Sequence, residues 1–457
     1  MRFDIYHFAV TALIFAVSCG EQRQKENPKK TERNITTKMI MVKPSDDYFV
    51  SDPDCQEGRK PAANRIDGGR IYLFYQENSN NYLTKQSVSF SGFSLESSPA
   101  LHASHISSIL TGSEYVRYCT GTYAAGECLD GNRYVDWNMS KGGAQLRFCD
   151  SFSDYDRNSY EGIAVTSVYY IENALSKYEK ALGRRIAGLE LEVLPLYQSV
   201  YVNEEDENGE KVAKVYSLVR NLAYFPGRNK IAVFPESERQ QKFFSKNGHL
   251  WENSFSMAHE AAHHIETIIA PPGGFKNRNT LIWNPLVHEY YAFPGSNADE
   301  YSVRFYSAVS EAFADIMGFY AVSENEGMVT SLFDFGYDRN PKNPYMRPNY
   351  EAKKEKRLDE RLYHNFFSPA REIPALNKVS PHGMGAVIAH GMYEIFSQMI
   401  PAESPSPEAM NEREKALINL TAIWIEKLHY AASELQNAKA DRSSYLVILA
   451  KAIAYSL

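Results

Sequence analysis

The chain has 457 residues, of which 44% are hydrophobic and 23% are charged, so it is long enough for two or three domains with at least one sizeable core. Its formal net charge of −7 argues against binding to nucleic acid, because phosphate recognition requires clustered Lys and Arg. We therefore expect a globular protein that has no nucleic-acid partner.

The amino-terminal segment is typical of an export signal. Arg2 is followed by a mostly apolar run over residues 8–17, which is too short to span a bilayer of about 30 Å but suits a signal-peptide core. The run ends in AVS directly before Cys19, an arrangement that resembles a bacterial lipobox. We predict a signal peptide at 1–19 and a lipid anchor at Cys19, in the outer membrane or at the surface of a bacterial cell. An ordinary secretory signal without lipidation is the alternative.

Four further cysteines are compatible with disulfides. An even number of cysteines in an exported chain fits two disulfides, for which three connectivities exist. A cysteine metal site is the alternative, but the chain has no CxxC pair that would support it. We favour disulfides among Cys55, Cys119, Cys128 and Cys149.

Residues 20–157 are divided by composition into two regions, neither of which indicates a chemistry. Residues 20–44 are polar and have no periodicity, which predicts a flexible tether. Residues 45–157 contain short aromatic and β-branched runs such as RIYLFYQ, broken by Gly, Ser and Asn, which predict a strand-rich region.

From residue 158 onward the sequence predicts an α/β lobe and then a helical lobe. In SVYYIENALSKYEKALG apolar residues recur at helical spacing, and Gly183 is placed to end the helix. LELEVLPLY and NKIAVFPES predict strands, and SMAHEAAHHIETIIA predicts a helix that ends before a Pro-Pro-Gly-Gly run. The fold class that we expect is α+β, with a mixed α/β lobe at 158–270 and an all-helical lobe at 271–457.

The segment HEAAH, residues 259–263, is the strongest functional signal. Histidines four positions apart share one helix face, so both imidazoles can bind one ion. Glu260 lies next to the first histidine and can reach a water in the metal's open position. A chance match to this short motif is the alternative. His264 and Glu266 are rotated away from the ligand face, and we expect both to be polar residues on the outer side of the helix.

A catalytic zinc takes three protein ligands, and the third candidate is Glu311 in AVSEAFADIMGFYA. Asp315 lies four positions later on the same helix face, where it can accept the outer N–H of a ligating histidine. Two solvated acids on an amphipathic helix are the alternative. The apolar neighbours argue against that alternative, because an unpaired charge among them would be costly.

HEAAH followed by SEAFADIMG resembles the gluzincin peptidases of the thermolysin type, including their fungalysin-like relatives. The resemblance covers the chain from about residue 161 to the C-terminus. It implies a two-lobed fold, one catalytic zinc and endopeptidase activity on extended polypeptides. It matches the zinc ligands to His259, His263 and Glu311, the general base to Glu260, and the carboxylate behind the first histidine to Asp315.

Two further segments extend the resemblance. HGMGAVIAHGMYEI begins at His382 and is similar to the family segment whose histidine hydrogen-bonds the transition-state oxyanion. NLAYFPGRNKIAVFPE is similar to the edge strand that pairs with substrate. Where the family has Asn-Ala, Leu222 precedes Ala223 and Asn221 stands one place earlier. The resemblance implies substrate contacts at Asn221, Ala223 and Arg347.

Other features differ from the thermolysin pattern or are left open. The gap between the second histidine and the glutamate is longer than in thermolysin, which predicts an inserted loop at about 271–302 beside the cleft. The oxyanion tyrosine of the family matches Tyr301 or Tyr306. The sequence leaves a calcium requirement open, and calcium is not indicated.

The function that we expect is hydrolysis of internal peptide bonds by a zinc-activated water, with Glu260 as general base and His382 stabilising the oxyanion. A zinc aminopeptidase also uses HExxH and a distant glutamate, but no glycine-rich amine-recognition strand precedes His259. A catalytically inactive, surface-anchored peptide-binding module is the alternative from another class. Loss of Glu260 or a ligand would favour it, and all of these residues are present.

Overall fold

The computed structural model describes the chain in separate stretches. Several predicted residues lie outside these stretches, namely Cys19, Cys55, Cys128, Cys149, Asn221 and Arg347, and the side chain of Cys119 is not among those described. The described residues are 38–41, 70–76, 83–89, 94–95, 101–102, 105–119, 129–130, 133–134, 138–146, 158–186, 188–205, 211–217, 222–235, 249–269, 281–284, 289–292, 300–324, 339–342, 345–346, 356–357, 381–402 and 406–435.

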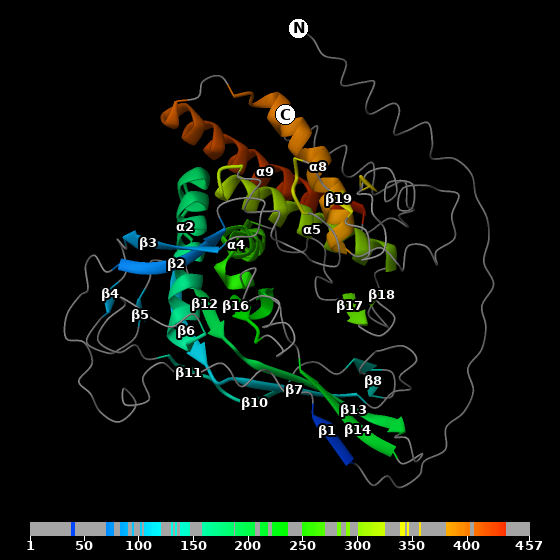
Figure 1. Ribbon diagram of the computed structural model, residues 1–457. Coiled ribbons are helices and arrows are strands. Elements are labelled where there is room, and N and C mark those ends of the chain that lie inside the picture. The colour runs from blue at the N-terminus through cyan, green and yellow to red at the C-terminus, as the bar shows by residue number, and fades with distance from the viewer. Residues whose placement is uncertain are drawn as a thin grey trace, which may run out of the picture.

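Two five-stranded mixed sheets lie in the lower half of Figure 1. The first has the order β1 (Lys38–Met41), β14 (Lys211–Ser217), β13 (Leu196–Glu205), β7 (Glu114–Cys119) and β10 (Asn138–Lys141). The second has the order β11 (Ala144–Gln145), β6 (Ile106–Thr111), β12 (Leu189–Val193), β16 (Lys230–Val233) and β15 (Leu222–Phe225). In the second sheet β6, β12 and β16 are parallel, and β15 pairs antiparallel with β16 as an edge strand.

The sheets correct two predicted boundaries. β6 precedes residue 157 in the chain, yet it pairs in parallel with β12, so the predicted boundary at residue 157 separates strands of one sheet. β1 lies within the predicted tether and pairs in parallel with β14, so residues 38–41 are sheet rather than linker. Sequence spacing could not reveal either pairing, because both join segments that are more than 80 residues apart.

Short two-stranded sheets complete the described β structure. They pair β2 (Arg70–Gln76) with β3 (Leu83–Ser89), β4 (Ser94–Leu95) with β5 (Leu101–His102), β8 (Leu129–Asp130) with β9 (Arg133–Tyr134), β17 (Leu281–Asn284) with β18 (Glu289–Ala292), and β19 (Tyr345–Met346) with β20 (Lys356–Arg357). The last two pairs lie in the lobe that was predicted to be all helical, so that prediction is wrong. The β17–β18 pair falls inside the predicted inserted loop, and β18 contacts α5.

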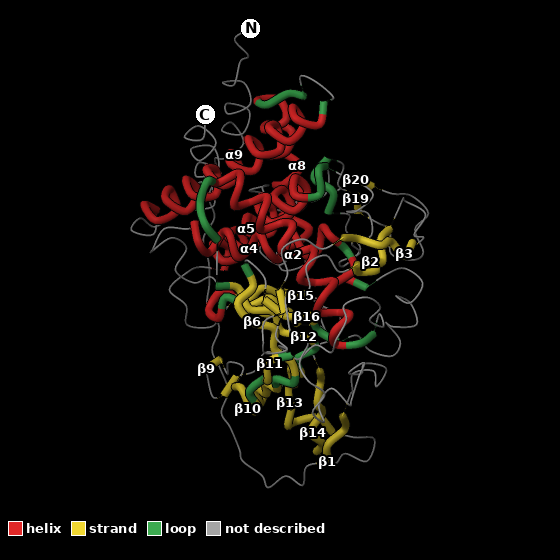
Figure 2. Tube along the Cα trace, turned by 90° about the vertical axis from the view of Figure 1, so that its left-hand side faces the viewer, coloured by secondary structure: helices red, strands yellow, loops and turns green. Residues whose placement is uncertain are grey.

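Most of the helices lie above the two five-stranded sheets in both views (Figures 1 and 2). Those in the described residues are α2 (Tyr160–Leu182), α4 (Ser254–Ile269), α5 (Glu300–Ala321), α8 (Pro381–Met399) and α9 (Pro407–Leu435), with single 3₁₀ turns η3 (Pro226–Arg228) and η4 (Leu250–Glu252). The predicted end of α2 is confirmed, because Gly183 adopts the left-handed conformation with φ 57°. Asn253 is the N-cap of α4, because its Oδ1 accepts a hydrogen bond from Ser256 N at 2.9 Å.

Helix α4 lies at the centre of the core, between α2 and α5 (Figure 1). It also contacts α9 and the edge strand β15. Tyr178 on α2 donates a hydrogen bond from its hydroxyl to Ala258 O at 3.0 Å. This bond joins α2 to α4 at the residue that directly precedes HEAAH. Two glycines permit close helix packing: Gly318 brings α5 against His259 N, and Gly385 brings α8 against Glu311.

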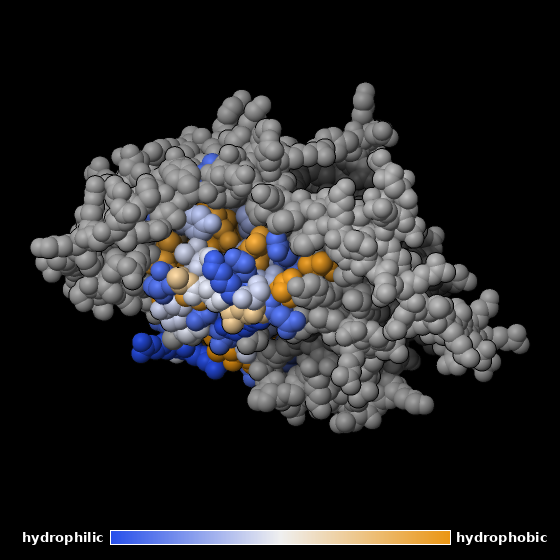
Figure 3. Space-filling view, turned by 90° about the horizontal axis from the view of Figure 1, so that it is seen from below, coloured by the Kyte–Doolittle hydropathy of each residue, from blue (hydrophilic) through white to orange (hydrophobic). Residues whose placement is uncertain are grey.

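The described structure is therefore mixed α/β, with helices and mixed sheets, which agrees with the expected fold class at this level. Hydrophilic and hydrophobic residues are interspersed on the described part of the surface seen from below (Figure 3). Within the described helices, none combines the length and the hydropathy that crossing a bilayer requires.

Candidate metal centre

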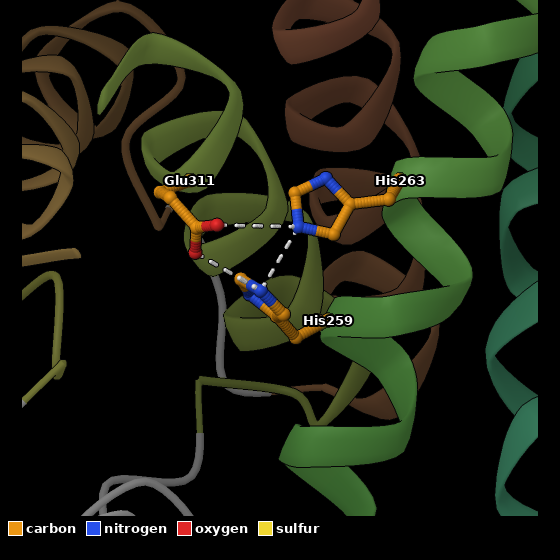
Figure 4. Close-up of side chains that lie close together, drawn as sticks. All are labelled: His259, His263 and Glu311. Carbon is orange, nitrogen blue, oxygen red and sulfur yellow. Dashed lines mark hydrogen bonds and ion pairs between the residues drawn. The ribbon is translucent and has the colours of Figure 1, made fainter. Parts of the chain in front are cut away.

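Helices α4 and α5 bring the three predicted ligands together (Figure 4). Nε2 of His259 lies 3.1 Å from Nε2 of His263 and 3.4 Å from Oε2 of Glu311. Oε1 of the same glutamate lies 3.8 Å from Nε2 of His263. Ligands bound at about 2.0–2.1 Å around a tetrahedral zinc ion are separated by about 3.3 Å. The three side chains therefore fit one metal ion without rearrangement of their helices.

Asp315 lies behind the first histidine, as predicted. Its Oδ1 is 3.0 Å from Nδ1 of His259, and the carboxylate is fully buried. Burial and the charge of Arg339 lower the pKa of His259, but hydrogen bonds to Asp315 and Glu311 outweigh them and raise that pKa to about 9. The contact between Asp315 and Nδ1 orients the His259 ring so that its Nε2 faces His263 and Glu311.

Arg339 is a site residue that the sequence did not indicate. Its buried guanidinium contacts both acids of α5, with Nη2 2.5 Å from Glu311 Oε2 and 2.9 Å from Asp315 Oδ1. Burial raises the pKa of Glu311, but the charges of His382 and Arg339 and contacts with His259 hold it well below its usual range. Arg339 lies in the described non-helical stretch 339–342, so no periodicity points to it.

The segment that carries Arg339 is attached to α8. Nδ1 of His390 lies 2.8 Å from Pro341 O, at hydrogen-bonding distance. Asn340 Oδ1 accepts a further hydrogen bond from Lys342 N at 2.9 Å, which closes the turn. The predicted arginine, Arg347, lies outside the described residues, and Arg339 is the arginine that the described residues bring to this site.

Glu260 lies beside the ligands but turns toward the edge strand. Its Oε2 accepts a hydrogen bond from Tyr224 N of β15 at 2.8 Å. Burial raises the pKa of this carboxyl group above its usual value. Ala223, a predicted substrate contact, precedes Tyr224 in the same strand. A carboxylate with a raised pKa beside a metal site is suited to accept and return a proton.

His382 also reaches the site. It lies in the first turn of α8, and its Nε2 is 3.5 Å from Glu311 Oε2. Gly385, one turn later, faces α5 so closely that an added Cβ would lie 2.7 Å from Glu311 Cβ. Of the two candidate tyrosines, Tyr306 donates its hydroxyl to buried Glu266 at 2.9 Å, and the side chain of Tyr301 is not among those described.

The expectation that His264 and Glu266 lie on the outer side of α4 is wrong. Their exposed fractions are 1% and 3%. His264 Nδ1 lies 3.1 Å from Tyr224 Oη, and Glu266 accepts hydrogen bonds from Tyr306, Ser310 and His429. The physical reason is that α4 is covered on several sides, by α2, α5, α9 and β15, so its polar residues face partners from distant segments.

Comparisons with known proteins add no assignment, since no protein-family model and no curated protein matches the chain. The chemistry of the site is therefore the basis for a function. Two imidazole nitrogens and one carboxylate oxygen form a donor set that suits zinc, and three protein ligands are typical of catalytic rather than structural zinc sites.

Proposed function

We propose that this chain is a zinc-dependent metalloendopeptidase of the thermolysin type. The observation that carries the proposal is the mutual placement of two imidazoles and a carboxylate at 3.1–3.8 Å. Glu260 lies on the same helix, where its carboxylate is attached to an edge strand. A chance HExxH motif would not be accompanied by a third ligand on a neighbouring helix and a carboxylate behind the first histidine.

His259, His263 and Glu311 would hold the metal. Zinc bound there would polarise a peptide carbonyl and lower the pKa of a water toward about 7. Glu260 takes the proton of the attacking water and then delivers it to the leaving amine. The hydrogen bond from Tyr224 N fixes one of its oxygens, so the other remains available for this transfer.

The remaining groups bind and orient the substrate. An extended peptide can add to β15 as a further strand, because β15 is an edge strand of its sheet. His382 is close enough to the ligands to donate a hydrogen bond to the carbonyl oxygen as negative charge develops on it. Asp315 holds both His259 and Arg339, and so fixes the positions of a ligand and of a neighbouring cation.

The fold and location belong to the same proposal. The mixed α/β part that contains α4 and the helices α5, α8 and α9 would be the two lobes of a thermolysin-like fold, with the site at their junction. Lipidation at Cys19 would anchor the enzyme in the bacterial cell envelope, where extended or unfolded polypeptides are its substrates.

The test is proteolysis by purified mature protein. We expect cleavage of casein and of an internally quenched peptide with a blocked amino terminus, loss of both activities with a zinc chelator, and recovery on addition of zinc. Glu260→Gln should keep zinc and lower turnover by about 10²–10⁴-fold. Glu394→Gln, which changes an exposed glutamate on α8, should be as active as wild type.

Three outcomes would contradict the proposal. Activity that is unaffected by the chelator would exclude a metal mechanism. Cleavage only of peptides with a free amino terminus would indicate an aminopeptidase. Peptide binding without turnover in zinc-loaded wild-type protein would indicate an inactive binding module.

A further inference from the structure

A hydrogen-bonded chain leads from the second histidine to helix α9. Ser310 Oγ lies 3.3 Å from Nδ1 of His263 and donates to Glu266 Oε2 at 2.5 Å. The other oxygen, Oε1, accepts from Tyr306 Oη at 2.9 Å and lies 3.1 Å from Nε2 of His429 on α9. Glu266 is 3% exposed and His429 is fully buried.

The direction of these hydrogen bonds follows from the chemistry of the groups. A carboxylate that accepts from Tyr306, Ser310 and His429 is an acceptor only, so the single hydroxyl proton of Ser310 is directed to Glu266. The Ser310 oxygen then has only lone pairs to offer His263. Nδ1 of His263 must therefore carry the ring proton, which leaves the lone pair on Nε2 for the metal.

The arrangement parallels the one at the first histidine. Asp315 contacts Nδ1 of His259 at 3.0 Å, whereas Glu266 Oε2 lies 3.7 Å from Nδ1 of His263 and is joined to it by the Ser310 hydroxyl. A buried carboxylate is costly unless it is hydrogen-bonded, and three donors from two helices, α5 and α9, satisfy this one. A purely structural tie between α4, α5 and α9 would not require its donor serine to lie beside the outer nitrogen of a ligand.

We propose that Glu266, acting through Ser310, is the positioning residue of His263, and that His429 and Tyr306 hold Glu266 in place. The proposal rests on the proposed metal site and adds a second orienting carboxylate to it. It links α9, the last helix of the described residues, to the metal centre through Glu266, which His429 of α9 contacts at 3.1 Å. Changes in α9 would then alter metal binding without touching a ligand.

The experiment measures zinc affinity, by competition with a chromophoric chelator, and the visible spectrum of cobalt-substituted protein. Glu266→Gln and Ser310→Ala should each weaken zinc binding by about 10–100-fold and alter the cobalt spectrum. The double variant should be little worse than Glu266→Gln alone, because Glu266 is the end point of both the Ser310 path and the direct 3.7 Å contact with His263. A purely structural role would lower stability and leave affinity and spectrum unchanged.

Glu172→Gln is the matched control. Glu172 is likewise a buried carboxylate that takes part in three hydrogen bonds, two from backbone N–H groups and one with the His105 ring, but it lies on α2 away from the ligands. The Glu172→Gln variant should have a lower free energy of unfolding than wild type and the same zinc affinity. Equal zinc affinity in folded Glu266→Gln and wild type overturns the proposal, as does an equal loss in Glu172→Gln.

The remaining outcomes are also decisive. If Glu266→Gln does not fold, Ser310→Ala decides, and wild-type affinity in that variant overturns the proposal. If wild-type protein itself binds no zinc, the proposed function fails. If wild-type protein and Glu266→Gln both bind zinc with equal affinity, only the role proposed for Glu266 fails.

Discussion

Gly385→Ala tests whether the contact between α8 and α5 positions the site. A Cβ at residue 385 would lie 2.7 Å from Glu311 Cβ, 2.9 Å from Ala308 O and 3.1 Å from Ala312 N. Non-bonded carbon atoms prefer separations of about 3.5 Å or more, so α8 must move away from α5 by roughly 1 Å. The obstructing atoms are backbone or Cβ atoms, which cannot rotate away as the end of a flexible side chain can.

Two consequences follow, and they are measured separately. Overpacking of this kind costs about 1–3 kcal/mol, so the free energy of unfolding in denaturant should fall by that amount. His382 is carried on the same helix, and a displacement of about 1 Å at a reacting group costs roughly 10²-fold in kcat/KM on the quenched peptide. The result for the free energy of unfolding does not depend on the chain being a peptidase.

Gly391→Ala is the control, since it lies on the same helix and a Cβ there would meet nothing within 4 Å. Alanine in a helix interior is favoured over glycine by about 0.5–1 kcal/mol, so this variant should gain stability and keep wild-type activity. If Gly385→Ala were as stable and as active as Gly391→Ala, the close packing of α8 on Glu311 would not exist in solution.

Three further predictions concern the ligands, pH and location. Glu311→Ala should abolish stoichiometric zinc, whereas Asp315→Ala should lower zinc affinity by about 10–100-fold; equal metal content in Glu311→Ala and wild type, measured by elemental analysis, would place the third ligand elsewhere. Burial lowers the pKa of His105, but its contacts with two α2 glutamates outweigh burial and raise it above 6.5. Its contribution to stability is therefore complete below pH 6.5 and is lost as pH rises through the raised value; denaturant titrations across this range should show the loss in wild type and not in His105→Gln. Cys19→Ser should move the protein from the detergent phase to the aqueous phase, or leave it unprocessed; a wild type that already partitions as a soluble protein would refute lipidation.

The ligand arrangement could be predicted because its information is local. Residues 259 and 263 share a helix face by spacing alone, and 311 and 315 do the same on a second helix. The packing of the two helices is prepared by small residues, including Gly318, which comes close to His259 N. Helix spacing thus predicted which residues share a face on each of the two helices. The resemblance of HEAAH and SEAFADIMG to one family predicted that the two faces would meet.

Arg339, Ser310 and Glu266 were not predicted, because their roles depend on distant partners. Arg339 reaches α5 from a non-helical segment, and Glu266 meets His429 across 163 residues of sequence. The rule that polar helix residues face solvent failed for α4 because that helix is covered by several elements. The sheet pairings of β1 and β6 were missed for the same reason, since register between distant strands leaves no local pattern.

The outer contacts of the two histidines determine which ring nitrogen of each faces the candidate metal site. Asp315 and Ser310 direct the ring protons of His259 and His263 to their Nδ1 atoms, so in the neutral rings both Nε2 atoms present lone pairs. These two lone pairs face each other across 3.1 Å, with the carboxylate of Glu311 beside them. When no metal is bound, positive charge at this place comes from a proton on His259, whose pKa is raised to about 9, and from the Arg339 guanidinium, whose Nη2 lies 3.3 Å from Nε2 of His259. A metal ion held by all three residues would take the place of that proton and would satisfy the lone pairs of both histidines at the same time, while Arg339 would remain in contact with Glu311.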